Sequence, residues 1–359
     1  MSRYAVPAVT LLCALAFAPP VVAAVKASDV IQPAIDGFVR PAYASLHGHA
    51  GAMTKAVKAL CATPSQGALD AARAEFLATV DAWSAVEIIR FGPITEGNRL
   101  ERMLYWPDRK GIGLKQVQAA LSDKDAAAAD PMQLAGKSVA MQGLGALEFV
   151  LYGSGAESLA GKDDPYRCAY GAAISGNIEA MAGDVSAAWD KPDGFAALWA
   201  NPGPQNALYH NGGEAVTQLL GVFIEGLEIT RDVRLKGFLG ANAKADKPKQ
   251  AIFWRSQYTT RSLAGNLTGM DALFQASRLG EALPEDTRWM AETAHIQFTN
   301  GAAAARAVTG PIEEVLTDPA RRAGLERVLQ ITSSLSDLFG SKVTAAFGLT
   351  AGFSSLDGD

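Results

Sequence analysis

Two Glu–Arg pairs with the same spacing are the first residues in the sequence that could build a polar binding site. Glu87 and Arg90 belong to one E-I-x-R stretch, and Glu228 and Arg231 belong to a second. Each pair continues an apolar stripe in steps of three and four, so both should point toward the core. The stripes are Leu69, Ala72, Phe76, Val80 and Trp83 in the first half, and Leu220, Ile224 and Leu235 in the second. The pairs are then either partly exposed i,i+3 ion pairs, or they line a polar cavity between two helical bundles and hold each Arg ready for an anion.

A third candidate is the run "MQGLGALEFVLYG", which is apolar apart from Gln142 and Glu148. It predicts the end of a buried helix over 131–153, yet it contains Gly143 and Gly145, each costing about 1 kcal/mol against Ala in a helix interior. Gly145 and Glu148 are three residues apart and share a helix face. Either the glycine permits close helix packing while the Glu reaches an Arg, or Gly145 opens a small polar pocket with Glu148 and Gln142 on its wall.

The histidines carry no familiar catalytic motif. The sequence has no H-E-x-x-H, and His47, His49 and His210 are expected at the surface or in loops. Glu292 and His295 have the i,i+3 spacing of half a di-metal carboxylate site, but the second E-x-x-H that such a site requires is missing. There is also no G-x-S-x-G elbow and no phosphate-binding glycine loop. These absences favour a binding protein over an enzyme.

The N-terminus has the pattern of a secretory signal peptide. One positive charge at Arg3 precedes an apolar stretch at 5–17, and a small-residue step predicts cleavage after Ala24. Cys13 follows two leucines instead of the small residue that a lipoprotein signal places before its cysteine. We therefore expect residues 1–24 to be removed from an exported, soluble protein that has no lipid anchor.

Charge and hydropathy argue against two classes of protein. The formal net charge is -5 and there is no basic run, so the sequence does not predict a basic surface for binding nucleic acid. Glu225 and Glu228 interrupt the best apolar stretch, which leaves no run of about eighteen apolar residues for a membrane span. We expect no integral membrane protein, although an association with the outer membrane stays open.

Cys61 and Cys168 are the cysteines that remain after the predicted cleavage. An oxidising exported compartment permits a disulfide between them. Two separate buried thiols are the alternative. A disulfide would close a loop of roughly a hundred residues and contribute about 4–5 kcal/mol in the chain-entropy treatment.

The apolar residues recur with a helical period and almost never alternate, which predicts an all-α fold. We expect long helices at 29–49, 66–91, 131–153, 167–190, 205–237, 248–278, 286–308 and 318–340. The stretch 191–206, rich in Pro and Gly, is the best joint between two helical-bundle halves. It separates an N-terminal domain (25–195) from a C-terminal bundle (196–345) and a tail (346–359). The repeated E-I-x-R suggests duplication of a four-helix-bundle-like unit.

Several longer motifs resemble the imelysin-like proteins, in the order found in that family and over nearly the whole mature chain. They are "AWSAVEIIRFGPI", "ERMLYWPD", "QGLGALEFVLYG", "RCAYGAAISGNIEAMAGDVSAAW", "GLEITRDVRLKGFLG" and "FWRSQYTTRSLAGNLTGMDALF". The resemblance implies an all-helical fold of two bundle-like halves with a site near their junction. It also implies a periplasmic or cell-surface location in Gram-negative bacteria and an association with iron uptake.

The resemblance further implies the metallopeptidase activity for which the family is named. Many members carry a G-x-H-x-x-E motif whose His and Glu are taken as metal ligands. In this chain the motif falls on Gly143, Gly145 and Glu148, so Gly145 replaces the His. A lone Glu cannot bind a divalent metal tightly without partners elsewhere. We therefore do not expect peptidase chemistry by a metal-bound water.

The second half matches the family's W-R-S stretch at Trp254, Arg255 and Ser256, which adds Arg255 and Ser256 to the expected pocket wall, together with Asp271. The complete set of candidate pocket residues is Glu87, Arg90, Gln142, Gly143, Gly145, Glu148, Glu228, Arg231, Arg255, Ser256 and Asp271.

Three functions remain open. The leading one is a periplasmic, non-enzymatic protein that binds a small ligand or an iron-uptake protein. The second is a metallopeptidase whose metal, iron or another divalent ion, is held by carboxylates such as Glu148 and a distant His such as His295. The third is a structural module for an outer-membrane receptor, which an apolar surface patch would favour. The sequence does not distinguish a metal, a haem, a siderophore or a peptide as ligand, and haem is not specifically signalled.

Overall fold

The computed structural model of the chain describes residues 26–349. All regular secondary structure in this range is helical, and the range contains no β-strand. The predicted all-α class is confirmed. None of the helices in this range combines the length and the apolar character that crossing a membrane requires. The predicted signal peptide (1–24) and the end of the predicted tail (350–359) lie outside the described residues.

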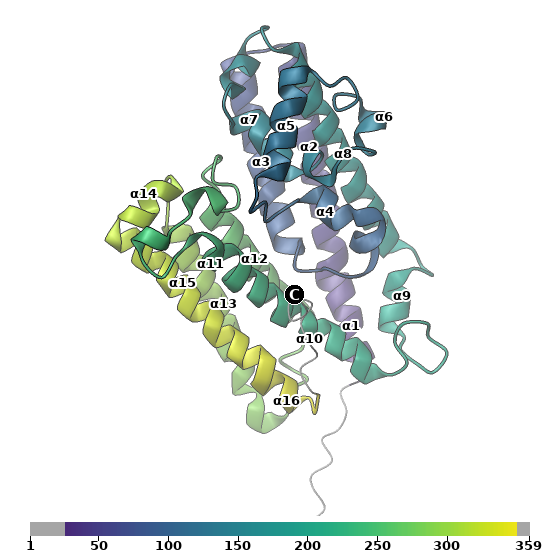
Figure 1. The fold of residues 1–359 in the computed structure, drawn as a ribbon. Helices are drawn as coiled ribbons and strands as arrows, with labels where there is room; N and C mark the ends of the chain where they lie inside the picture. Colours follow the sequence, from purple (N-terminus) through teal and green to yellow (C-terminus); the bar gives the residue numbers. More distant parts are fainter. Residues whose placement is uncertain (1–25, 350–359) are drawn as a thin grey trace, which may run out of the picture.

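The N-terminal elements form the group of helices at the upper right of Figure 1, which continues down the right-hand side of the picture. Its α-helices are α1 (Ala27–Ala34), α2 (Arg40–Ala62), α3 (Gln66–Val86), α4 (Arg99–Met103), α5 (Ile112–Asp123), α6 (Pro131–Leu134), α7 (Leu144–Tyr152), α8 (Pro165–Asp190) and α9 (Phe195–Ala200). Shorter turns are the π-helical η1 (Ile35–Val39) and the 3-10 turns η2 (Gly92–Asn98), η3 (Val139–Met141) and η4 (Ala156–Ala160). The long helix α2 packs against both α3 and α8, which gives this group its bundle.

Helix α3 shows how the sequence produces this packing. It begins after Ser65, whose hydroxyl accepts a hydrogen bond from the backbone N–H of Ala68 at 3.1 Å. Every residue of the predicted apolar stripe is buried against the neighbouring helices. The helix ends at Val86, so Glu87 follows directly on a buried face and is itself buried.

A disulfide joins Cys61, near the end of α2, to Cys168, in the first turn of α8, with 5.5 Å between their Cα atoms. The two cysteines therefore form a disulfide and are not separate buried thiols. The bond connects two helices that already pack along their length, and it closes a loop that contains the whole of α3 to α7.

The C-terminal elements form the second group, to the left of and below the first in Figure 1. Its α-helices are α10 (Gly212–Glu228), α11 (Lys236–Phe238), α12 (Thr259–Ala276), α13 (Trp289–Ala307), α14 (Ile312–Thr317), α15 (Pro319–Asp337) and α16 (Thr344–Ala346). Shorter turns are the π-helical η5 (Ile229–Leu235) and η9 (Leu338–Val343) and the 3-10 turns η6 (Ala243–Ala245), η7 (Pro248–Gln250) and η8 (Glu285–Thr287). Helix α13 packs against α12 and α15, and Phe223 of α10 stacks on Phe339 at 4.7 Å between ring centres.

The two groups meet where α12 packs against the end of α3. A Cβ on Gly265 would lie 2.6 Å from the Cβ of Ser84, and one on Gly269 would lie 2.0 Å from the carbonyl oxygen of Ala85. Both glycines of α12 are therefore needed for the backbones to approach this closely. One buried apolar cluster runs through both groups, and the division into domains at 195/196 stays a prediction.

Two predicted helices are interrupted in the structure. The helix expected over 131–153 ends at Leu134 and resumes at Leu144, because the backbone at Gly143 is extended and contacts other main-chain atoms. The helix expected over 248–278 begins only at Thr259. The irregular segment that precedes it becomes part of the candidate site.

The start of the second half also differs from the prediction. Helix α10 begins at Gly212, not at 205, because the side chain of Asn211 accepts the N–H of Glu214 and caps the helix there. The stretch 191–206, predicted as a joint, contains helix α9. Its Trp199 is fully buried and packs edge-on against Phe91 at 5.0 Å between ring centres, so this stretch is part of the packed structure.

Candidate functional site

The two glycines of the "QGLGALEF" motif lie just before α7 (Gly143) and in its first turn (Gly145), and they have different roles. A Cβ on Gly143 would lie 2.4 Å from the carbonyl oxygen of Arg102 and 2.5 Å from that of Met103, so the glycine permits a close main-chain contact with α4. A Cβ on Gly145 would meet nothing within 4 Å. Gly143 is thus required by packing, whereas Gly145 leaves open space.

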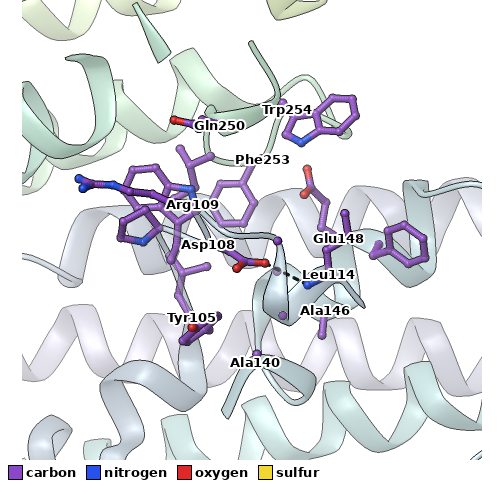
Figure 2. A pocket seen from close by; sticks show the side chains of 18 of the residues that line it. Tyr105, Asp108, Arg109, Leu114, Ala140, Ala146, Glu148, Gln250, Phe253 and Trp254 are labelled. Atoms are coloured by element: carbon purple, nitrogen blue, oxygen red, sulfur yellow. Dashed lines mark hydrogen bonds between the residues drawn. The ribbon is translucent and has the colours of Figure 1, made fainter. Parts of the chain in front are cut away.

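This open space belongs to a pocket of about 420 Å³ between the two groups of helices, a volume typical of small-molecule sites (Figure 2). Its walls are the segment 104–114, the side of α7 that carries Gly145 and Glu148, and the segment 249–255, and Val233 and Gly237 also line it. Three segments far apart in sequence therefore build one concave surface. Of the predicted pocket residues, it includes Gly143, Gly145, Glu148 and Arg255.

Glu148 is the buried carboxylate of the pocket, with 3% of its surface exposed. Its Oε1 accepts hydrogen bonds from the backbone N–H of Ser256 at 2.9 Å and from the Ser256 hydroxyl at 2.8 Å. Burial raises the pKa of the Glu148 carboxyl, and the hydrogen bonds from Ser256 oppose that shift. Figure 2 shows its carboxylate pointing toward the segment with Phe253 and Trp254. Ser256 thus belongs to the site through Glu148, although it does not line the pocket.

Arg255 provides a positive charge beside this carboxylate. Its guanidinium lies 4.3 Å from the ring centre of Trp254 and 5.3 Å from that of Phe149, both within cation–π range. Burial lowers the pKa of Arg255, and Glu148 opposes that shift, but an Arg remains charged at neutral pH. The loop before it is conformationally demanding, since Phe253 has a φ of 51°. The pocket therefore combines a fixed Arg with aromatic walls.

Glu87 and Arg90 do not line this pocket. Glu87 forms a bidentate ion pair with Arg234 of η5, and its Oε1 also accepts a hydrogen bond from Asn266 at 2.7 Å. The expected pairing of Glu87 with Arg90 is therefore wrong, because η5 brings a different Arg to the carboxylate from the other half. Arg90 is half-buried, and burial lowers its pKa while Glu87 opposes the shift.

Glu228 and Arg231 do not form the expected pair either. Arg231 donates to the carboxylate of its neighbour Asp232, with Nε–O distances of 3.0 Å. The buried Oε2 of Glu228 accepts no hydrogen bond within the described residues. The reason is the π-helical geometry that begins at Ile229, which changes the angular spacing on which the i,i+3 pairing depended.

Gln142 and Asp271 lie outside the pocket. Gln142 is fully buried, accepts a hydrogen bond from Arg102 at 2.8 Å and donates to the carbonyl of Lys137 at 2.7 Å, so it joins the start of α7 to α4. Asp271 of α12 lies 2.9 Å from Nδ1 of His295 on α13. Neither Asp271 nor His295 lines the pocket.

The structure also brings in pocket residues that were not among the predicted ones. They are Tyr105, Trp106, Asp108, Arg109, Lys110, Lys249, Gln250, Phe253 and Trp254. The motifs "ERMLYWPD" and "FWRS" contained five of these residues, so aromatic and charged residues in non-helical stretches were the available signal. Asp108 accepts the N–H groups of Ile112 and Leu114 at 2.8 and 3.0 Å and so fixes the start of α5 beside the pocket.

The donor set does not fit a transition metal. Within residues 26–349 no group of three or more His, Cys, Asp or Glu side chains is placed to hold an ion. Among the described residues, the pocket lining contains two such side chains, Asp108 and Glu148, and each already accepts two hydrogen bonds. The positive charge of Arg255 next to Glu148 further disfavours a cation.

The fold and the site therefore define an all-helical protein with a pocket between two groups of helices. The sequence profile of the family described as Imelysin matches residues 39–338. The chain therefore belongs to the imelysin family, as its motifs indicated. It departs from the family's motif at Gly145, in the wall of the pocket.

Individual relatives agree with this assignment. The chain is 22% identical to iron-regulated protein A of Synechococcus elongatus over 319 residues, which cover 86% of this chain and 84% of that protein. An imelysin-like protein from Psychrobacter arcticum has the same fold, with a TM-score of 0.74 at 19% identity over 91% of this chain and 97% of that one. A protein from Parabacteroides distasonis, provisionally assigned as an iron-regulated protein A precursor, matches with a TM-score of 0.74 at 16% identity. The match covers 92% of this chain and 97% of that one.

Proposed function

We propose that this protein is a periplasmic, non-enzymatic member of the imelysin family that binds a small ligand in iron acquisition. The pocket between the proposed domains, 25–195 and 196–345, is its binding site. The observation that supports this proposal is the open space beside Gly145, in a pocket that is also lined by Glu148, Arg255 and aromatic side chains.

The location and the connection with iron rest on separate observations. The pattern of residues 1–24 predicts export. The names of the Synechococcus and Parabacteroides relatives both describe iron-regulated proteins. Iron regulation is thus the context in which we place the ligand.

The two other functions have less support. A peptidase site would need His295 near Glu148, but His295 contacts Asp271 on α12 instead. A receptor-docking module would need a continuous apolar patch, whereas the large exposed apolar residues lie on several separate elements. They are Tyr105, Ile112, Met132, Leu208, Trp289 and Ile296.

The proposal is tested by filling the pocket. A deletion strain is complemented with the wild type, with Gly145→Leu or with Gly67→Leu, and iron uptake is measured under iron limitation. Gly67 is a matched control, since it is an exposed helical glycine on α3 whose Cβ would also meet nothing within 4 Å. We expect uptake to fall with Gly145→Leu alone. Full uptake with both variants, each present at wild-type level, would rule out the pocket as the functional site.

A further inference from the structure

The walls of the pocket carry more positive than negative charge. Four basic side chains line it, Arg109, Lys110, Lys249 and Arg255, against the two carboxylates Asp108 and Glu148. The whole chain has the opposite balance, with a net charge of -5. A local excess of cations attracts anions to this pocket even though the chain as a whole is acidic.

Both carboxylates are already engaged within the protein. Asp108 accepts two backbone N–H groups at the start of α5. Glu148 accepts two hydrogen bonds from Ser256. These hydrogen bonds give both carboxylates partners within the protein, so neither depends on a bound cation for one. The bonds to Glu148 oppose but do not outweigh the burial that raises the pKa of its carboxyl.

Arg255, in contrast, has donors available for a ligand. Its guanidinium lies over the faces of Trp254 and Phe149, which orient it without using its N–H groups. In the described part of the chain, no oxygen accepts a hydrogen bond from this guanidinium. A planar guanidinium with free N–H donors matches a carboxylate group, which it can bind through two parallel hydrogen bonds.

The remaining walls are flat and apolar. Trp106, Phe253 and Trp254 present aromatic rings to the cavity, and the missing side chain at Gly145 leaves space between them and α7. Figure 2 shows Phe253 near the centre of the site, with Glu148 and Trp254 to one side of it. Rings of this kind bind a flat apolar group by offset or edge-to-face contact.

We infer that the ligand of this pocket is an organic anion, with a carboxylate that pairs with Arg255 and a flat apolar body that lies against the aromatic walls beside Gly145. This inference rests on the proposed function, because it names the chemical class of the ligand for the same pocket. It does not depend on a metal ion in the site.

The test uses two probes that differ only in charge, 2-naphthoate and 2-naphthamide. Each is titrated into the full mature chain by calorimetry at pH 7.5. We expect naphthoate to bind at least about tenfold more tightly, as a charge-assisted pair predicts. Arg255→Met keeps an apolar side chain on Trp254 and should remove this preference, while Arg255→Lys should retain part of it. Lys58 is an exposed cation on α2 outside the pocket, so Lys58→Met should leave the affinity for both probes unchanged.

The possible outcomes separate this inference from the proposed function. Equal binding of both probes, abolished by Gly145→Leu, would overturn the anion inference and leave the pocket as a ligand site. Binding of naphthoate that survives both Arg255→Met and Gly145→Leu would also overturn it, because the probe would then bind elsewhere. If neither probe binds, the inference is again overturned, and the iron-uptake phenotype of Gly145→Leu decides the proposed function independently.

Discussion

Arg234 and Glu87 lie 147 positions apart in the sequence and form a bidentate ion pair in which the two side chains are only 3% and 5% exposed. Asn266 accepts a hydrogen bond from the Arg and donates one to the Glu, each 2.7 Å long. The network therefore connects η5 and α12 of the second half to the end of α3 in the first. Both charges are removed from water at the junction of the two groups of helices.

Breaking this pair should strongly destabilise the protein. Arg234→Met leaves Glu87 buried without its partner, which costs about 3–5 kcal/mol in comparable buried pairs. The double variant Glu87→Gln/Arg234→Met should recover part of that loss, because no unpaired charge remains. Urea unfolding of the wild type, both single variants and the double variant measures the coupling. Arg231→Met is the control, since its pair with Asp232 is partly exposed and should contribute no more than about 1 kcal/mol.

The two glycines of the α7 motif should respond oppositely to the same substitution. Gly143→Ala forces a Cβ into two backbone carbonyls and should cost about 1–3 kcal/mol. Gly145→Ala meets no atom and should stabilise the helix by up to about 1 kcal/mol. Chemical denaturation of the two variants side by side measures the difference. Equal effects would contradict the separate roles assigned to these residues.

Glu148 should make the stability depend on pH. Because its pKa is raised in the folded protein, the folded state holds the proton more tightly, and the wild type loses stability as the pH rises above about 4.3, the usual pKa of Glu. Glu148→Gln keeps an acceptor for Ser256 without a charge. In urea melts between pH 4 and pH 7.5, we expect the free energy of unfolding of the variant to rise relative to that of the wild type as the pH increases. A stability difference that is independent of pH would show that Glu148 does not titrate in this window.

The disulfide should contribute much of the stability of the first half. Its cysteines are separated by 107 positions, and closing so long a loop is worth about 4–5 kcal/mol in the chain-entropy treatment. Cys61→Ala/Cys168→Ala should therefore lower the urea midpoint clearly, and a reducing agent should affect the wild type but not this variant. Mass spectrometry of the unreduced mature protein should detect no free thiol. Two free thiols would contradict the bond.

Properties that depend on neighbouring residues in the chain could be predicted from the sequence. The helical period correctly identified the all-α class and the buried stripe of α3, whereas it left open whether Glu87 is buried or partly exposed. Family motifs pointed to Gly145, Glu148 and Arg255, which the structure brings to the same pocket. The class and the stripe could be predicted because a stripe on one helix needs no knowledge of what packs against it.

The hydrogen-bond and ion-pair partners of these residues could not be predicted from the sequence. Arg234 follows Arg231 by three positions in the same stretch, and only the π-helical path of η5 together with the packing of α12 on α3 selects it as the partner of Glu87. The same packing brings the segments 104–114 and 249–255 to the pocket that Gly145 lines. Local periodicity thus specifies which faces are buried, whereas the pairing of charges and the walls of the pocket depend on contacts between segments more than a hundred residues apart, whose geometry follows from how the helices pack.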